Sequence, residues 1–226
     1  MPNDPRSTIH DPRARQPSPF PHAKPFLTWL SVLCGVLVLF HLPWLAAICG
    51  LLFIYVLYFF RAPTPRSPDD PMAILAPAHG KVTDIVDCEE PSFIKGPARR
   101  IGIFLSIFDI HVQACPTDAT IKWAEYRPGR FLDARDPACS AQNECQWLGF
   151  ESRDGFRCTV KLVAGLIARR IVLWRPKNKP LRRGDRISLI RFGSRVEIFL
   201  PMKTELLVQV GDRVKGGETI VGRKRS

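Results

Sequence analysis

The residues of this chain that could do chemistry centre on one dipeptide, Gly193-Ser194. Alternating apolar runs flank it, residues 186–192 before and residues 195–200 after. Taken alone, a Gly-Ser pair between two such runs predicts a tight β-turn, because glycine tolerates positive φ and serine hydrogen-bonds to its own backbone. The same pair also offers a hydroxyl next to a carbonyl on permissive backbone, which is what an intramolecular attack on the chain requires.

Two histidines, His79 and His111, fall in the part of the chain that follows a long apolar segment. Imidazole changes its protonation near neutral pH, so histidine is the side chain best suited to proton transfer. A lone histidine in a strand-like segment is otherwise a packed or hydrogen-bonded structural residue. The seven cysteines, at positions 34, 49, 88, 115, 139, 145 and 158, show neither Cys-x-x-Cys pairs nor a metal-binding spacing. We therefore expect reduced thiols in a cytoplasmic compartment and no metal site.

The apolar segment from Phe26 to Phe60 contains no charged residue and predicts a membrane anchor. As one helix it would be about 52 Å long, against a hydrocarbon core of about 30 Å, so a single straight span fits poorly. Pro43 is expected to break it near His41, which predicts a helical hairpin over residues 25–60. A tilted span followed by an interfacial helix is the alternative. Basic residues on both flanks favour both ends in the cytoplasm, and the run is too long for a cleaved signal peptide.

The rest of the chain divides into a tail, a linker and one domain. Residues 1–24 predict a disordered cytoplasmic tail, and the prolines of residues 61–71 predict a stiff linker. In residues 72–226 short apolar runs alternate with turn residues, which predicts a mainly β (α+β) domain of barrel or sandwich type. Its end, residues 207–220, resembles a lipoyl- or biotinyl-type hammerhead. A carrier lysine at Lys203 is disfavoured because it lies only eight positions before Gly211.

The net charge of +12 calls for an anionic partner. No basic helix and no basic strand with interleaved aromatic residues stands out, so nucleic acid is not expected. A basic domain tethered to an anionic membrane leaflet fits better, because each basic side chain near such a surface contributes about 1 kcal/mol. A merely solvated basic surface is the alternative for any single residue.

The run from Ile190 to Pro201 resembles the processing segment of the short, bacterial and archaeal type of phosphatidylserine decarboxylase. Further blocks resemble that family in the family's order, over roughly residues 26 to 222. They are Phe59-Phe60-Arg61-Ala62-Pro63, Ser106-Ile107-Phe108-Asp109-Ile110-His111-Val112, Tyr126-Arg127-Pro128-Gly129-Arg130-Phe131, Asn143-Glu144 and residues 163–172.

The resemblance implies that the Gly193–Ser194 bond breaks and that Ser194 becomes a pyruvoyl group. The carbonyl of that group would form a Schiff base with the substrate amine and accept the electrons left by decarboxylation, as pyridoxal phosphate does elsewhere. The implied products are a membrane-bound β chain, residues 1–193, and an α chain, residues 194–226, which stay together as a heterodimer or a higher oligomer. The implied enzyme is a carboxy-lyase that converts phosphatidylserine to phosphatidylethanolamine on the cytoplasmic side of the cell membrane.

His111 matches the family histidine in its block, so the resemblance implies general acid/base work for it. His79 is a departure, because the family usually has Asp at this position, where it supports self-processing. A neutral imidazole can act as a base, but it supplies no fixed negative charge to a partner imidazolium. We therefore expect slower processing, a rearranged pair with His111, or no processing. A second departure, residues 115–120, has no mechanistic explanation.

Phospholipid binding requires cationic and apolar contacts. Guanidinium groups offer bidentate donors for phosphate or carboxylate, and the proposed contacts are Arg169, Arg170, Arg191 and Arg195. Phe108, with Phe59 and Phe60, is expected to admit the acyl chains. Two alternative functions stay open, a decarboxylase of archaeal ether-linked serine lipid and an unprocessed membrane-bound scaffold or lipid-binding relative.

Overall fold

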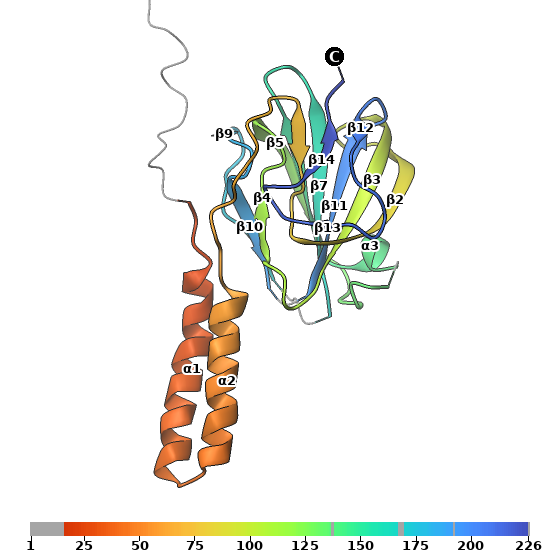
Figure 1. Cartoon of the computed structure of the whole chain (residues 1–226). Coiled ribbons are helices and arrows are strands. Elements are labelled where there is room, and N and C mark those ends of the chain that lie inside the picture. Colours follow the sequence, from red (N-terminus) through yellow and green to blue (C-terminus); the bar gives the residue numbers. More distant parts are fainter. Residues whose placement is uncertain (1–15, 137, 167–169, 192, 226) are drawn as a thin grey trace, which may run out of the picture.

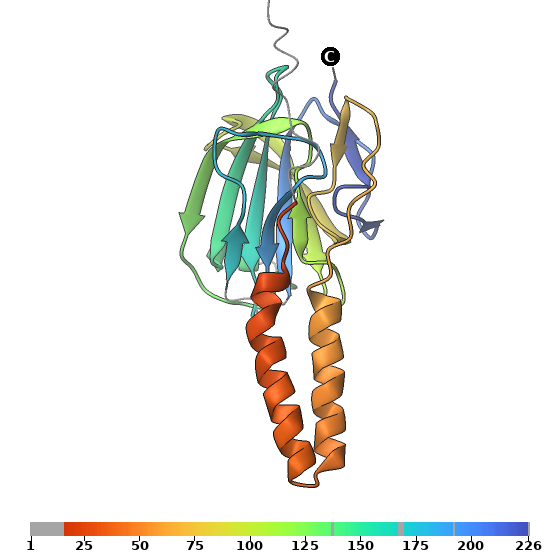
Figure 2. The same ribbon diagram turned by 90° about the vertical axis from the view of Figure 1, so that its left-hand side faces the viewer.

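The computed structural model describes residues 16–136, 138–166, 170–191 and 193–225, which form a β domain standing on two helices (Figure 1). Helix α1 (Phe20–Leu39) and helix α2 (Pro43–Phe59) lie side by side in both views of the ribbon (Figures 1 and 2). His41, with φ of 56°, makes the turn between them. Pro43 is the first residue of α2. Proline is tolerated there because an amide group at the start of a helix has no acceptor within the helix, so its absence costs no hydrogen bond.

Helix α1 is long and apolar enough to cross a membrane, and α2, with 17 residues, is shorter. Helix α1 begins at Phe20, before residue 25, where the sequence predicted the hairpin to begin. Residues 1–15 of the expected tail lie outside the described residues. Gln16 is described, and its side-chain oxygen accepts hydrogen bonds from the Arg186 amide at 3.1 Å and from the Arg175 guanidinium at 3.0 Å.

Three antiparallel sheets build the domain, and the prediction of a mainly β fold is confirmed. The largest sheet is curled and has the order β13 (Arg213–Val214), β2 (Gly80–Glu90), β3 (Gly96–Leu105), β11 (Ser194–Pro201), β7 (Arg157–Ala164), β6 (Cys145–Glu151), β5 (Ala119–Arg127), β9 (Pro180–Leu181). The second has the order β4 (Val112–Ala114), β10 (Arg186–Ile190), β8 (Ile171–Leu173). The third has the order β1 (Ala73–Leu75), β14 (Ile220–Arg223), β12 (Glu205–Leu206).

The main apolar core lies between these sheets and draws side chains from all three. Strand β11 illustrates how alternation places them, since Val196, Ile198 and Leu200 are fully buried in this core. The intervening residues Arg195 and Glu197 are buried as well, because the segment that carries the short helix α3 (Cys139–Gln142) covers the other face of the sheet. A central strand covered on both faces therefore holds its charged residues out of water.

Strands β10 and β11 do not form a hairpin, and the tight β-turn interpretation of Gly193-Ser194 is wrong. Strand β10 pairs with β4 and β8, whereas β11 pairs with β3 and β7. The dipeptide thus lies where the chain passes from one sheet to another. Alternation predicts which face of a strand is buried, but it does not specify the neighbouring strand, which explains the error.

A second apolar cluster joins the two helices to the sheet that contains β4 and β10. Its buried members are Ala23, Leu27, Val56, Phe59, Phe60, Val112 and Leu189. The helices therefore pack directly on the end of the β domain, and what lies at that end is positioned at the head of the apolar hairpin (Figure 2).

Candidate functional site

The Gly193-Ser194 junction lies at the start of β11, whose first residue is Ser194, and the Ser194 hydroxyl is isolated from water. Ser194 pairs with Leu105 of β3 and with Ala164 of β7, so strands on both sides hold its backbone. Its side chain is fully buried, and its Oγ has no hydrogen-bond partner among the described residues. A buried hydroxyl without a partner costs about 1–3 kcal/mol. Such a group is typical of a reactive position.

The Gly193 carbonyl is confined by close backbone packing. Gly193 has φ of +67°, in the left-handed region that favours glycine. A Cβ atom on Gly165, which follows β7, would lie only 2.3 Å from the Gly193 carbonyl oxygen. The site therefore needs glycine at both positions, one for its conformation and one for the close approach.

The His111 imidazole is hydrogen-bonded to this junction. Its Nε2 atom accepts the Gly193 N–H at 3.1 Å, and its Nδ1 atom lies 2.9 Å from the main-chain oxygen of Asp109. These partners assign the proton to Nδ1, which donates to the Asp109 carbonyl, and leave the lone pair on Nε2. Burial lowers the pKa of His111 to about 4, and the Phe59 ring packs against it with 4.4 Å between centroids. The imidazole is therefore neutral at pH 7.

Strands β4 and β10 fix the main chain on either side of this contact. The His111 carbonyl accepts hydrogen bonds from the Ile190 amide at 3.1 Å and from the Gln113 side chain at 2.7 Å. The Ser188 hydroxyl donates to the same Gln113 side chain at 2.8 Å. Asp109 is also fixed, since its carboxylate accepts the Ser106 amide at 2.8 Å and the Ser106 hydroxyl at 2.7 Å. Pairing of β10 with β4 thus brings residue 193 to the imidazole.

His79 lies between β1 and β2, directly before Gly80, and is half-buried. Burial lowers its pKa, while the negative charges of Glu218 and Asp109 act in the opposite direction. The charge of His79 is among the influences that lower the pKa of His111, so the two rings share one electrostatic environment. No hydrogen bond joins them in the part of the chain that the structure describes.

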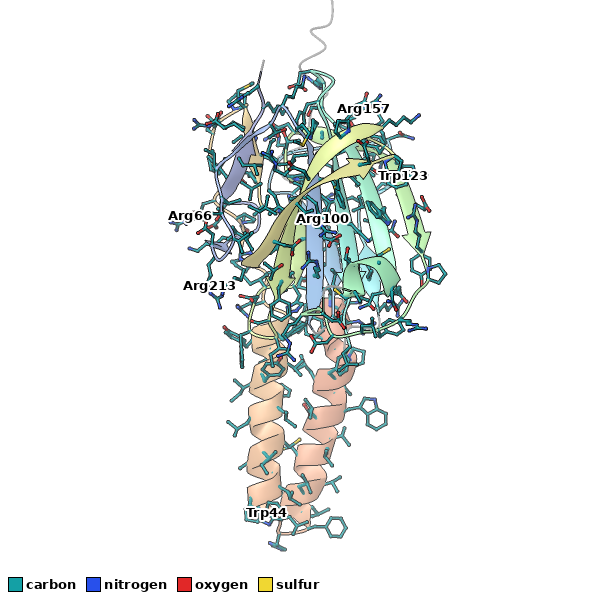
Figure 3. All side chains as sticks on the ribbon, turned by 90° about the vertical axis from the view of Figure 1, so that its right-hand side faces the viewer. Trp44, Arg66, Arg100, Trp123, Arg157 and Arg213 are labelled. Carbon is teal, nitrogen blue, oxygen red and sulfur yellow. The ribbon has the colours of Figure 1, made fainter. Side chains whose placement is uncertain are left out.

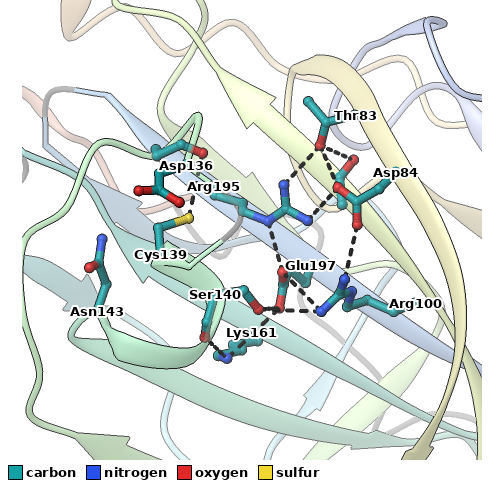
Figure 4. Close-up of polar contacts among 12 residues, drawn as sticks. Thr83, Asp84, Arg100, Asp136, Cys139, Ser140, Asn143, Lys161, Arg195 and Glu197 are labelled. Atoms are coloured by element: carbon teal, nitrogen blue, oxygen red, sulfur yellow. Dashed lines mark hydrogen bonds and ion pairs between the residues drawn. The ribbon is translucent and has the colours of Figure 1, made fainter.

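The four arginines expected to bind substrate do not lie together in the structure. Arg169 lies outside the described residues. Arg170 and Arg191 are neighbours, since the Arg191 amide donates to the Arg170 carbonyl at 3.4 Å. Burial, and then the charge of Arg170, lower the pKa of Arg191, and neither guanidinium has an ion-pair partner within the described ranges. Arg195 instead contacts Glu197 and acidic residues on the face of the sheet opposite the core (Figure 4).

Phe108 lies where the helices meet the domain. Its side chain is 62% exposed, and its carbonyl accepts hydrogen bonds from the Arg61 guanidinium at 2.7 Å and from the Tyr58 hydroxyl at 3.4 Å. Phe59 and Phe60, expected to act with it, are buried in the cluster between helices and sheet. The segment that carries His111 is thus joined by polar and apolar contacts to the end of α2.

Comparison with known proteins matches residues 52–222 to the family model described as phosphatidylserine decarboxylase. The protein named phosphatidylserine decarboxylase proenzyme of Desulfotalea psychrophila is 39% identical over 214 residues, which cover 94% of this chain and 96% of that protein. This chain belongs to the phosphatidylserine decarboxylase family.

Other relatives of the same printed name agree with this assignment. That of Symbiobacterium thermophilum is 43% identical over 169 residues, covering 75% of this chain and 79% of its own length. That of Carboxydothermus hydrogenoformans is 41% identical over 196 residues, with 86% and 84% covered. The matched range includes Gly193, Ser194, His111 and His79. The prediction of this family, and of an enzyme, is confirmed.

Sequence reasoning missed two parts of this candidate site. Gly165 lies in a block that resembles the family, and its signal was a lone glycine directly after an apolar strand, which marks close backbone approach. The main-chain carbonyl of Asp109, which orients His111, carries no sequence signal at all. Within the described residues no cluster of three His, Cys, Asp or Glu side chains could hold a metal ion.

Proposed function

We propose that this chain is the precursor of a pyruvoyl-dependent enzyme that converts phosphatidylserine to phosphatidylethanolamine and carbon dioxide after cleaving itself between Gly193 and Ser194. One observation carries the proposal. A buried, unpartnered serine hydroxyl follows a glycine in left-handed backbone, and the amide of that glycine is hydrogen-bonded to a neutral imidazole. Membership of a family whose relatives are named proenzymes supports it.

The chemistry of self-cleavage suits these groups. Ser194 Oγ attacks the Gly193 carbonyl carbon, the peptide C–N bond breaks, and the proton from the hydroxyl passes to the freed amino group, which leaves an ester. Removal of the Cα proton of residue 194 then expels the Gly193 carboxylate from Cβ and leaves dehydroalanine. Water converts this residue to a pyruvoyl group and releases ammonia. His111 Nε2, with its lone pair beside the junction, is suited to carry the proton between these groups.

A prosthetic group made from the chain itself suits this site, since the buried Ser194 hydroxyl, which would be consumed, has no hydrogen-bond partner among the described residues. Once formed, the pyruvoyl carbonyl supplies the electron sink that decarboxylation of an amino acid requires. After carbon dioxide has left, we assign to His111 the protonation of the substrate carbon that carried it. His79, half-buried in the same electrostatic environment, is assigned to proton transfer during processing.

The substrate headgroup is assigned to the unpaired guanidiniums near the junction. Arg191 is two residues from Gly193, and Arg170 adjoins it. Two cations without an ion-pair partner in the described chain repel one another, and a phosphodiester between them relieves that repulsion. Phe108, exposed at the head of the helices, is assigned to the acyl chains. An archaeal ether-linked serine lipid presents the same headgroup, and only its tails differ.

We assign the helix pair to the cell membrane, with the domain on the cytoplasmic side. Its apolar side chains are largely exposed, and Trp44 lies at the tip farthest from the domain (Figure 3). Basic side chains such as Arg213 lie on the β domain near the helices, where an anionic leaflet would be (Figure 3). The substrate would then reach Ser194 from the bilayer without crossing bulk water.

The experiment is a decarboxylation assay with phosphatidylserine labelled in its carboxyl group and incorporated in anionic vesicles. The full-length chain releases labelled carbon dioxide, and the Ser194→Ala variant releases none. Decarboxylation by Ser194→Ala at the rate of the unsubstituted chain would contradict the proposal. Binding of the vesicles by both proteins without any decarboxylation would instead favour the unprocessed, lipid-binding alternative suggested by His79.

A further inference from the structure

A network of charged side chains, three of them buried, lies on the outer face of β11, directly after the Gly193-Ser194 junction (Figure 4). The Arg195 guanidinium donates to Glu197 at 2.8 Å and to Asp84 of β2 at 2.6 Å. Glu197 in turn lies 3.8 Å from the Lys161 ammonium of β7 and 3.9 Å from the Arg100 guanidinium of β3. Glu197 is 0% exposed and Arg195 is 5% exposed, so these ions are sequestered from water.

The surrounding structure is shaped to hold this network. Gly102 pairs with Glu197 across β3, and a Cβ atom on it would lie 2.0 Å from the Arg195 guanidinium. A larger residue at position 102 would therefore displace the Arg195 guanidinium from this place. The Thr83 hydroxyl accepts a further hydrogen bond from Arg195 at 2.9 Å, and the Ser140 hydroxyl of α3 donates to Glu197 at 3.0 Å.

Burying Arg195, Glu197 and Lys161, with Asp84 and Arg100 half-buried beside them, is not an efficient way to stabilise a fold. Desolvation of each ion costs several kcal/mol, and well-packed apolar residues often stabilise a core as well or better. Asp84 and Arg195 also stay charged. Burial raises the pKa of Asp84, but hydrogen bonds from Arg195 and Thr83 outweigh it and hold that pKa below its usual value. Burial likewise lowers the pKa of Arg195, but Glu197 and Asp84 outweigh it and raise that pKa. The contact between Arg195 and Asp84 is therefore a permanent ion pair rather than a pH switch.

Cleavage as proposed above divides this network between two chains, and the inference rests on that cleavage. Arg195 and Glu197 fall in the α chain, as its second and fourth residues. Their other side-chain partners among the described residues fall in the β chain: Thr83, Asp84, Arg100, Ser140 and Lys161. We propose that this network is a clamp that holds the new N-terminus of the α chain in the site after the peptide bond is lost.

The need for a clamp follows from the position of the reactive group. A chain terminus is the part of a strand that frays most readily, and the proposed pyruvoyl group is the terminal residue itself. Before cleavage, residues 191–193 tether β11 to β10. After cleavage that end is held by its pairing with β3 and β7 and by the side chains of Arg195 and Glu197. Arg195 is thus a positioning residue, not a contact to substrate.

The test compares cleaved and uncleaved protein, because a merely structural network would matter equally in both. Arg195→Met is introduced into the full-length chain and into the Ser194→Ala chain, and hydrogen exchange of the amides from Val196 to Ile198 is measured on lipid vesicles. We expect exchange to accelerate by roughly a hundredfold in the cleaved protein, since removing one partner of a buried ion pair is strongly destabilising. In the uncleaved chain we expect less than about tenfold, because the tether to β10 limits fraying.

Arg99→Met is the matched control, since Arg99 also lies on the large sheet but pairs with exposed Asp87 at 2.6 Å, within the β chain alone. It should leave this exchange unchanged in both backgrounds. Arg195→Lys, which keeps the charge but loses the forked contact, gives the same comparison if Arg195→Met does not fold. Equal acceleration in cleaved and uncleaved protein would overturn the clamp. A mass spectrum of the same samples separates this outcome from failure of the proposed function, in which the unsubstituted chain stays in one piece and no terminus exists to be clamped.

Discussion

The proton on His111 decides what this imidazole can do at the Gly193–Ser194 bond. Because Nδ1 donates to the Asp109 carbonyl, the lone pair on Nε2 faces the junction, where it accepts the Gly193 amide at 3.1 Å. A main-chain carbonyl orients the ring but carries no full charge, and burial disfavours the imidazolium. The site therefore starts from a neutral base, and any transient positive charge on it must be stabilised from elsewhere.

The burial of His111 makes stability depend on pH. Its pKa is lowered from 6.5 to about 4 in the folded chain, so between these values the unfolded chain binds more protons and stability falls as pH falls. Relative to a His111→Gln chain, the loss at about pH 4.5 is about 2.5 kcal/mol. Urea unfolding of both proteins at pH 7 and at about pH 4.5, in the uncleaved Ser194→Ala background, measures it. Equal losses in the two proteins would contradict a buried neutral imidazole.

His79 gives a second prediction at this scale. A carboxylate at this position would favour the protonated form of His111, whereas a protonated His79 disfavours it. We expect His79→Asp to preserve or accelerate self-cleavage, measured as the rate at which the α chain appears. His79→Asn, which carries no charge, is the control and should not accelerate it. Strong inhibition by His79→Asp would count against a role of His79 in proton transfer.

At the scale of elements, the site lies where β10 ends and β11 begins, two successive strands that belong to different sheets. Alternation was enough to predict a strand on each side of the dipeptide, and the structure has β10 at Arg186–Ile190 and β11 at Ser194–Pro201. It could not assign β10 to one sheet and β11 to another, since pairing partners are set by distant residues. The roles of Ser194 and His111 followed from a resemblance to a family. The Gly165 contact and the Arg195 network did not, because both depend on which strands are neighbours.

The close approach of Gly165 to the junction is testable. Gly165→Ala would place a Cβ atom 2.3 Å from the Gly193 carbonyl oxygen, so the carbonyl must move. Because a misplacement of about 1 Å can reduce a rate about a hundredfold, we expect self-cleavage to slow by about that factor. Gly96→Ala is the control, since a Cβ atom there meets nothing within 4 Å. Cleavage of Gly165→Ala at the unsubstituted rate would show that this packing does not position the carbonyl.

At the scale of the whole molecule, the helix pair and the site form one unit. Phe59 at the end of α2 packs on the His111 ring, and the buried cluster around it draws on α1, α2, β4 and β10. Helices of 20 and 17 residues are about 30 and 26 Å long, close to the thickness of a hydrocarbon core. On the proposed membrane assignment, the hairpin would therefore reach deep into a bilayer while its head keeps the candidate site at the surface.

A hairpin anchor predicts that both termini lie on the same side of the membrane. With a peptide tag at each end, protease added to inside-out vesicles of the cell membrane should remove both tags, and protease added to right-side-out vesicles should remove neither. This result follows from an even number of crossings with basic flanks in the cytoplasm. Tags removed from opposite sides would indicate a single span, with the other helix lying in the interface.

The central claim, that this chain cuts itself at Gly193-Ser194, is tested most directly by the intact masses of the purified chain beside those of Ser194→Ala. Our account predicts two fragments for the unsubstituted chain, residues 1–193 and residues 194–226, the smaller with a pyruvoyl terminus, and one intact chain for the variant. A single intact chain in both samples, under conditions where the protein is folded and membrane-bound, would contradict it.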